Sequence, residues 1–327
     1  MNLQPKELKN EAALRLATTP GNHNKLALIY GAVALGVGVF CQLIAFLTNL
    51  AISNMSGLST LGTRAILQSI QSFFPVAANL LLPFWAFGLM QTVLRLIRQE
   101  RVEPRDLLGG FSRLFVIVRL YLFIILFFWC IAFLAFNLAT IILNFTPFAN
   151  TMLASWLPYV QDAALLEEAL SDPAQTAALM KSAYPLLILG GILLLAFGLP
   201  AVYGMRLSFY RVLDQDRPGA LRAITQSRRM MRGNKIALFK LDLSFWWYYL
   251  AIILSSLLLY VPSYLPAPFN SDLAFLVAAL IQAGICLWLY TKYLIRIEAS
   301  YAVFYDTLYE AHNAPPAPPV FWQQPQQ

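Results

Sequence analysis

Six long apolar runs constrain this chain more than any other feature, because each is long enough to cross a lipid bilayer. They cover roughly residues 26–52, 73–94, 114–143, 183–209, 236–262 and 273–296. A transmembrane helix needs about 20 predominantly apolar residues. Prolines interrupt the second run, which is the weakest of the six. Only 12% of the residues are charged, against about 25% in a typical soluble domain. The sequence therefore predicts an all-α polytopic membrane protein with six transmembrane helices.

The segments outside these runs complete the predicted domain organisation. Residues 1–25 are polar, and apolar residues repeat at i, i+4 and i+8 from Leu8, which predicts a short amphipathic helix. The six-helix transmembrane domain is expected at residues 26–310. Residues 311–327 are rich in Pro and Gln and are expected to form a disordered tail.

The basic residues predict the orientation in the membrane, because cytoplasmic loops accumulate Lys and Arg. With the N-terminus inside, all of the 23 Lys and Arg residues except Arg64 and Lys181 fall on the cytoplasmic side or at its interface. The densest cluster lies between residues 206 and 240. We therefore expect both termini in the cytoplasm. An acidic outer loop is expected at residues 144–182, with Asp162, Glu167, Glu168 and Asp172.

A basic segment between the fourth and fifth runs predicts a helix with two different sides. One half of the helix carries Ala220, Ala223, Ile224, Ser227, Met230 and Met231. The other half carries mainly Arg222, Gln226, Arg229 and Arg232, with Arg228 at the boundary. The basic face is defined as Arg222, Arg228, Arg229, Arg232 and Lys235, the last of which follows the helix. Such a helix, which should stop at Gly233-Asn234, can lie at the membrane surface with its apolar side in lipid. Two interpretations stay open, a plain topology determinant and a surface that docks anionic lipid or a partner protein.

One acidic residue stands inside the fifth apolar run. A carboxylate at the centre of a membrane helix costs about 2.5–3.5 kcal/mol on insertion scales and less near the interface. Asp242 should therefore find a cation. Lys240 is two residues away and points elsewhere on a helix. Arg119 is expected at a similar depth in the third run, and we predict that Arg119 and Asp242 form a buried ion pair, or that a loop arginine replaces Arg119.

The sequence contains no recognisable catalytic constellation. Its only histidines, His23 and His312, lie near the two ends of the chain, and Cys41, Cys130 and Cys286 lie in separate apolar runs. Motifs for zinc proteases, serine hydrolases and phosphate-binding loops are missing. We expect no enzyme activity, no metal or cofactor and no nucleic-acid partner. The aromatic repeat after the sixth run, from Tyr301 to Tyr309, is expected to leave the membrane along its surface.

Five short motifs resemble a family of six-span bacterial integral membrane proteins, common in Gram-positive bacteria and known only as a domain of unknown function. The motifs are Lys6-Glu-Leu-Lys9, Gly109-Gly-Phe111, Leu199-Pro-Ala-Val-Tyr203, the stretch from Ser227 to Phe245, and Ala302-Val-Phe-Tyr305. The chain departs from the family pattern at Trp246-Trp-Tyr-Tyr249, in its long acidic outer loop and in its tail. The resemblance implies a bacterial plasma-membrane protein and transfers no activity.

Two hypotheses about function follow. In the first, the protein is a non-enzymatic membrane module whose basic face engages anionic lipid at the cytoplasmic surface or a partner membrane protein. The alternative is a transporter or permease that uses the buried charges Arg119 and Asp242. Matched proline-interrupted runs in the two halves of the chain favour the alternative, since such spans can mark a transport site.

Overall fold

Six helices are long and apolar enough to cross a membrane in the computed structural model of the protein, and the described residues include no strand. The structure describes residues 4–19, 23–55, 61–162, 165, 169, 171–214, 219–264, 266 and 272–313. The predicted tail beyond residue 313, the acidic Glu167 and Glu168, and Arg217 lie outside these ranges. The predicted fold class, an all-α polytopic membrane protein, is confirmed.

The six membrane-crossing segments are His23–Ser53, Gly62–Ile97, Leu114–Leu143, Ala174–Asp214, Trp246–Tyr264 and Leu273–Asn313. The second is a single helix, α3 (Leu61–Ile97), that continues through Pro75 and Pro83. Proline is tolerated in membrane helices because neighbouring groups can satisfy the backbone that it leaves unpaired. The interruptions noted in the second run are therefore accommodated without a break.

The fifth segment begins later than the apolar run from residue 236 suggested. Helix α11 (Lys235–Leu243) ends first, and α12 (Trp246–Leu257) starts after Ser244 and Phe245. Phe245 has φ −111° and ψ 14°, outside helical geometry. Asp242 therefore lies in α11, before the helical segment Trp246–Tyr264 that is long and apolar enough to cross a membrane.

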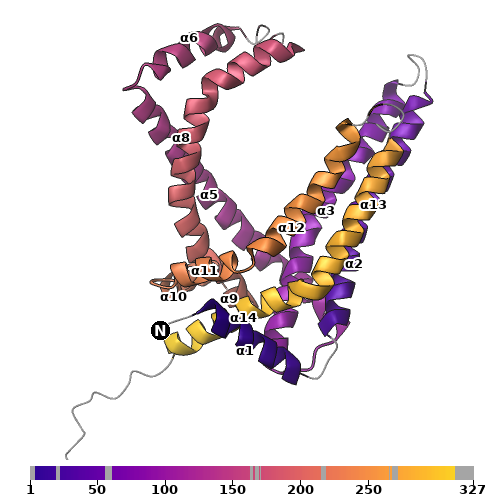
Figure 1. Cartoon of the computed structure of the whole chain (residues 1–327), viewed down its shortest axis with the longest axis vertical. Helices are drawn as coiled ribbons and strands as arrows, with labels where there is room; N and C mark the ends of the chain where they lie inside the picture. Colours follow the sequence, from indigo (N-terminus) through magenta and orange to yellow (C-terminus); the bar gives the residue numbers. More distant parts are fainter. Residues whose placement is uncertain are drawn as a thin grey trace, which may run out of the picture. The chain divides into compact units, whose positions relative to one another are not determined.

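The chain forms two compact units, which are described separately. The first contains residues 1–117, 209–218 and 236–327, and the second contains residues 118–208 and 219–235. In the first unit, α2 (His23–Ser53), α3 and α13 (Asp272–Leu289) run side by side with α12 (Figure 1). A π-helical turn, Tyr290–Leu294, joins α13 to α14 (Ile295–Asn313).

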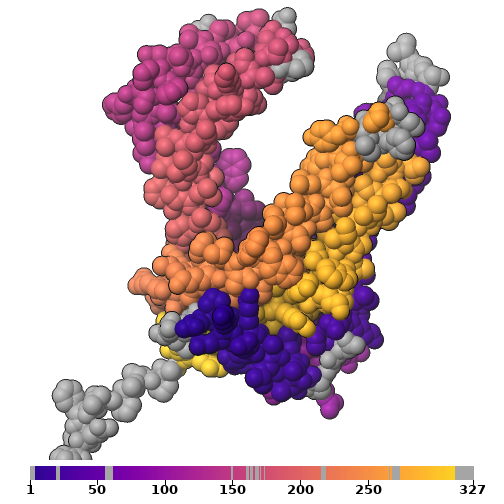
Figure 2. Space-filling view, viewed as in Figure 1, coloured from indigo at the N-terminus to yellow at the C-terminus, as the bar shows by residue number. Residues whose placement is uncertain are grey.

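The core of the first unit lies at one end of this bundle, where both terminal helices meet. Helix α1 (Pro5–Thr18) packs along α14, and its buried residues are Leu8, Ala12 and Leu16. Figure 2 shows indigo α1 against the orange and yellow C-terminal segments. Tyr301 and Tyr305 of α14 are at most 2% exposed. The aromatic repeat of α14 thus forms protein core, which differs from the expectation that it runs exposed along the membrane surface.

Two glycines allow α3 to contact the following turns through the backbone. These turns are the 3₁₀ helix η2 (Pro104–Leu108) and the short α4 (Gly109–Ser112). A Cβ atom on Gly88 would lie 1.7 Å from the carbonyl oxygen of Leu107, and one on Gly110 would lie 2.0 Å from that of Phe84. Both distances are far inside van der Waals contact. Only glycine fits these positions without moving the backbone.

The second unit consists of α5 (Leu114–Leu143) beyond its first turn, α6 (Phe148–Gln161), α8 (Pro173–Met205) and α10 (Ala220–Met230). Helix α5 approaches α8 at Gly190, where a Cβ atom would lie 2.5 Å from the ring of Phe136. Asp172 caps the N-terminus of α8 by accepting a hydrogen bond from the backbone NH of Ala174. Helix α6 packs against the first half of α8 (Figure 1).

Candidate functional site

The predicted basic helix is α10, and its two sides differ as the sequence indicated. Its buried residues are Ala220, Ala223, Ser227 and Met230. Helix α10 ends at Met230, and Gly233 follows with φ +85°, a left-handed conformation that favours glycine. The helix therefore stops shortly before Gly233-Asn234, as predicted. Asn234 Nδ2 donates a 3.1 Å hydrogen bond to the carbonyl oxygen of Met230 and supports the turn.

Helix α10 is fixed to α8 inside the second unit. The hydroxyl of Ser227, which is fully buried, donates a 2.9 Å hydrogen bond to the carbonyl oxygen of Gly204 near the C-terminal end of α8. The guanidinium of Arg228 lies 5.0 Å from the centroid of the Phe127 ring in a cation–π contact. The ammonium of Lys235 also lies near Gly204. Cations near the C-terminal end of a helix are stabilised by its dipole.

The arginines of the basic face remain exposed although Arg228 also contacts Phe127. Arg222, Arg228, Arg229 and Arg232 are exposed, and Lys235 is half-buried. None of the ion pairs found among the described residues involves these five side chains. The apolar half of α10 is occupied by protein, which differs from the interpretation in which that half lies in lipid. The face that remains available is the cationic one.

Asp242 has a tyrosine partner. The hydroxyl of Tyr301 in α14 donates a 2.5 Å hydrogen bond to Asp242 Oδ1 and lies 2.8 Å from the hydroxyl of Tyr249 in α12. Asp242 is half-buried. The hydrogen bonds among Asp242, Tyr301 and Tyr249 thus connect helices α11, α14 and α12 within the first unit. The short distance to Tyr301 is typical of a hydrogen bond to a charged acceptor.

Arg119 belongs to the other compact unit, and its side chain is exposed. The predicted pair between Arg119 and Asp242 therefore stays a prediction. The hydrogen bond between Asp242 and Tyr301 was not predicted from the sequence.

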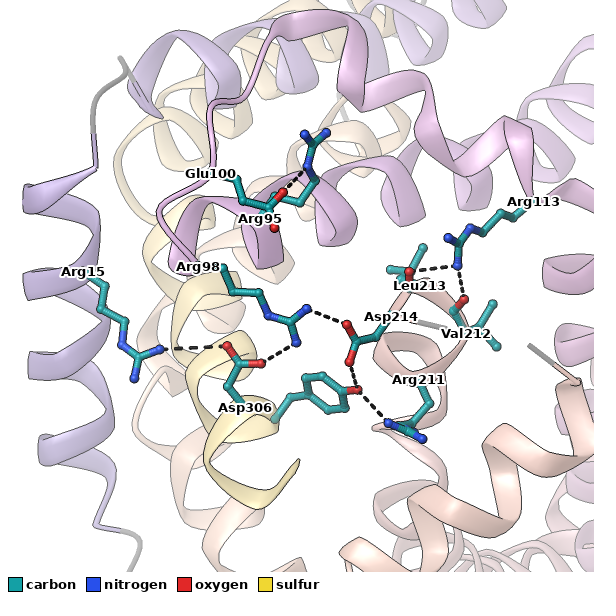
Figure 3. Close-up of polar contacts among 11 residues, drawn as sticks. Arg15, Arg95, Arg98, Glu100, Arg113, Arg211, Val212, Leu213, Asp214 and Asp306 are labelled. Atoms are coloured by element: carbon teal, nitrogen blue, oxygen red, sulfur yellow. Dashed lines mark hydrogen bonds and ion pairs between the residues drawn. The ribbon is translucent and has the colours of Figure 1, made fainter. Parts of the chain in front are cut away.

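A network of ion pairs around Arg98 joins four helices of the first unit, and sequence reasoning missed it. Arg98 follows the C-terminal end of α3, and its guanidinium donates to two carboxylates (Figure 3). Nη1 lies 2.5 Å from Oδ1 of Asp214, and Nη2 lies 2.8 Å from Oδ1 of Asp306. Asp214 ends α9 (Ser208–Asp214), and Asp306 lies in α14. Arg15 of α1 completes the network, 3.9 Å from Asp306 Oδ2.

Burial and further donors strengthen this network. The side chains of Asp306 and Asp214 are 8% and 12% exposed. The hydroxyl of Tyr305 donates a 2.8 Å hydrogen bond to Asp214 Oδ2, and Arg211 in turn donates to Tyr305 over 3.4 Å. The hydrogen bond to Asp214 raises the pKa of Arg98 above its usual range, burial opposes this, and Asp306 adds to the increase. The two carboxylates thus stabilise the charged form that arginine always has in proteins.

The end of α9 is held by a second arginine. Arg113 Nη1 donates hydrogen bonds of 2.5 and 2.8 Å to the carbonyl oxygens of Val212 and Leu213 (Figure 3). These carbonyls lie in the last turn of a helix, where they have no partner within the helix. The C-terminal end of α9 is therefore held in place by Arg113.

Lys9 links the N-terminal helix to the break between α11 and α12. Its ammonium donates a 2.9 Å hydrogen bond to the carbonyl oxygen of Ser244 and lies 3.9 Å from the centroid of the Phe245 ring. Burial lowers the pKa of Lys9. Two of the motifs quoted above, Lys6-Glu-Leu-Lys9 and the end of the stretch from Ser227 to Phe245, are thus in direct contact.

Among the described residues there is no metal cluster, and the cavities given below are not lined by the residues of the transport hypothesis. The described ranges contain no group of three or more His, Cys, Asp or Glu side chains that could hold a metal ion. Three cavities have volumes of about 340, 480 and 460 Å³. Their lining residues, a few each from positions 140–186, 131–197 and 65–74 respectively, include neither Arg119 nor Asp242. These cavities give the transport hypothesis no specific support.

Comparison with known proteins identifies relatives without an assigned activity. The model of a family described as "Protein of unknown function (DUF975)" matches residues 3–312. The resemblance found in the sequence is thereby confirmed over nearly the whole chain. No curated protein and no solved structure matches the chain.

Proposed function

Since the chain belongs to this family of unknown function, we propose its role from its own residues: a non-enzymatic module of the bacterial plasma membrane whose basic face binds anionic lipid headgroups. The observation that carries the proposal is the exposure of Arg222, Arg228, Arg229 and Arg232 on a helix whose opposite half is buried. An acidic surface of a partner membrane protein is the alternative ligand for the same face.

The mode of binding follows from the packing of α10. An amphipathic peptide binds a membrane by inserting its apolar side and by attracting anionic lipid with its basic side. In this protein Ala223 and Met230 pack against protein, so only the electrostatic part is available. Each Lys or Arg close to an anionic leaflet contributes about 1 kcal/mol, and the contribution decays within a Debye length. Binding should therefore be sensitive to salt and to the charge of the lipid.

Rigid attachment favours this role over that of a plain topology signal. A topology signal needs positive charge in a loop but no defined geometry. Here the Ser227 hydrogen bond to Gly204 and the contact of Arg228 with Phe127 hold the arginines on one side of a docked helix. Such preorganisation lowers the entropy lost when headgroups bind.

Selective retention of phosphatidylglycerol tests the proposal. The full-length protein is reconstituted into bilayers of phosphatidylcholine and phosphatidylglycerol and extracted with a mild neutral detergent, and the lipids that copurify are quantified. Wild type should retain phosphatidylglycerol in excess over its share of the bilayer, and the excess should fall at high salt. Replacing Arg222, Arg228, Arg229 and Arg232 by Gln should remove the excess.

A matched variant separates the basic face from total charge. Lys6, Arg101, Arg105 and Lys240 are also exposed, and their replacement by Gln removes the same charge elsewhere. This control should retain phosphatidylglycerol as wild type does. If both quadruple variants retained as much phosphatidylglycerol as wild type, the lipid proposal would be contradicted. If both lost the excess equally, the effect would be one of net charge and not of the basic face.

A further inference from the structure

A cavity of about 340 Å³ lies in the second unit, between the C-terminal end of α5, helix α6 and the first half of α8. Its polar lining residues are Thr140, Asn144, Asn150 and Ser182, and Phe148 and Leu186 are among its apolar ones. The charge distribution predicts that this end of the unit faces outward. The volume is within the range of about 300–1,000 Å³ typical of small-molecule sites.

Hydrogen bonds hold the walls of the cavity in place. The indole Nε1 of Trp156 in α6 donates a 3.0 Å hydrogen bond to the hydroxyl of Ser182 in α8, which itself donates to the carbonyl oxygen of Leu179 over 2.7 Å. The turn between α5 and α6 is closed by the NH of Thr146, which donates to the carbonyl oxygen of Leu143 over 2.8 Å. The cavity is therefore bounded by elements that are fixed to one another.

The lining offers uncharged hydrogen-bonding groups and no ionisable side chain. Each carboxamide provides two donors and one acceptor. Asn144 and Asn150 make no side-chain hydrogen bond to another residue in the described ranges. Thr140 donates to the carbonyl oxygen of Phe136 and keeps its oxygen as an acceptor. A charged ligand would find no counter-charge here, and its desolvation would be uncompensated.

We propose that this cavity binds a neutral sugar ring. A pyranose presents adjacent hydroxyls around its rim, which the carboxamides of Asn144 and Asn150 can pair with as donors and acceptors. It also presents apolar C–H groups on its face, which can pack on Phe148 and Leu186. The same chemistry can come from the headgroup of a neutral glycolipid or from a free saccharide. The site is separate from the basic face and requires no anionic lipid.

Protection of an introduced cysteine thiol from maleimide labelling measures how far the cavity is occupied, whether the sugar comes from a glycolipid or from a free saccharide. Met152 lines the cavity, so Met152→Cys is made in a full-length chain in which Cys41, Cys130 and Cys286 are replaced by Ala. The rate of maleimide labelling is measured in phosphatidylcholine nanodiscs. One arm adds methyl glucoside in solution, a second includes monoglucosyl diacylglycerol in the bilayer, and a third includes phosphatidylglycerol. A sugar ligand should slow labelling in at least one of the first two arms and not in the third.

Variants connect protection to the proposed contacts. Asn150→Leu and Asn144→Leu keep the side-chain volume, and each should weaken protection about threefold to tenfold, as expected for one lost hydrogen bond. Asn54→Leu makes the same change in the other unit and should leave protection intact. Leu186→Trp, which fills the cavity, is the substitute variant if either asparagine variant fails to elute as a folded protein.

The pattern of protection identifies the source of the sugar. Protection by the glycolipid alone identifies a lipid ligand, and protection by methyl glucoside alone identifies a soluble ligand. No protection by either sugar, or protection equal in all variants, would overturn the proposal.

Discussion

Arg98 and Asp306 are joined by a 2.8 Å hydrogen bond although 208 residues separate them in the chain. The contact connects the end of α3 to the C-terminal helix, and Asp214 binds the other branch of the same guanidinium. A planar guanidinium can satisfy two carboxylates at once, which a lysine ammonium cannot do with the same geometry. The end of α3, the C-terminal helix α14 and the end of α9 are therefore joined at one arginine.

Replacing Arg98 by Gln should destabilise the protein by about 2 kcal/mol. Removing one partner of a buried pair costs about 3–5 kcal/mol, and the partial exposure of Arg98 reduces this. Asp214 and Asp306, both largely buried, would face each other without their shared cation. The free energy of unfolding is measured by denaturant titration in mixed micelles. Arg105→Gln is the control, because its pair with Glu103 is 82% and 62% exposed and should contribute less than about 1 kcal/mol. Equal losses in the two variants would contradict the interpretation.

Gly88→Ala should destabilise the protein by about 3 kcal/mol or more, because the added methyl group meets the Leu107 carbonyl and the backbone must move. Gly36→Ala is the matched control in another membrane-crossing helix, since a Cβ atom at that position has no neighbour within 4 Å. Its stability should stay unchanged or rise slightly, as helix propensity favours alanine. Unfolding in mixed micelles followed by circular dichroism distinguishes the two. A Gly88→Ala protein as stable as wild type would show that α3 and η2 are not in contact.

Hydrophobic patterning predicted the parts of the fold that the bilayer dictates. A lipid environment requires about 20 apolar residues with internally satisfied backbone, so six segments and their helical state could be read directly. The two sides of α10 were also predictable, because the 100° spacing separates Ala223 and Ser227 from Arg222 and Arg229. Both predictions depend on local periodicity, which a single sequence contains.

The pairings between distant residues could not be predicted in this way. Asp306 is the one acidic residue in the aromatic stripe from Tyr301 to Tyr309, and this was the available signal for a buried ion pair. Its partner Arg98, however, is one of many arginines near the predicted inner surface. The choice among them depends on how the helices pack. The division of the chain into two compact units likewise has no periodic signature.

Tyr301→Phe should destabilise the protein by about 1 kcal/mol, because Asp242 loses the donor to its Oδ1 atom. A hydrogen bond to a charged group contributes about 1.5–3 kcal/mol, and the partial exposure of Asp242 reduces this. Tyr264→Phe, at a side chain that is 86% exposed, should have no measurable effect. A double-mutant cycle of Tyr301→Phe with Asp242→Asn should show coupling. In the parallel cycle, strictly additive losses for Arg119→Ala and Asp242→Asn would exclude the ion pair predicted from the sequence.

Ser227→Ala should destabilise the second unit by about 1 kcal/mol and also weaken lipid selectivity. The substitution removes the donor to the Gly204 carbonyl while all arginines of the basic face remain. If α10 acts by holding those arginines in a fixed arrangement, loosening it should reduce the excess of phosphatidylglycerol that copurifies. Thr225→Ala, on the exposed side of the same helix with a hydroxyl that donates only to Leu221, should change neither quantity. A variant with reduced stability and unchanged lipid retention would show that positive charge alone, without the docked geometry, accounts for binding.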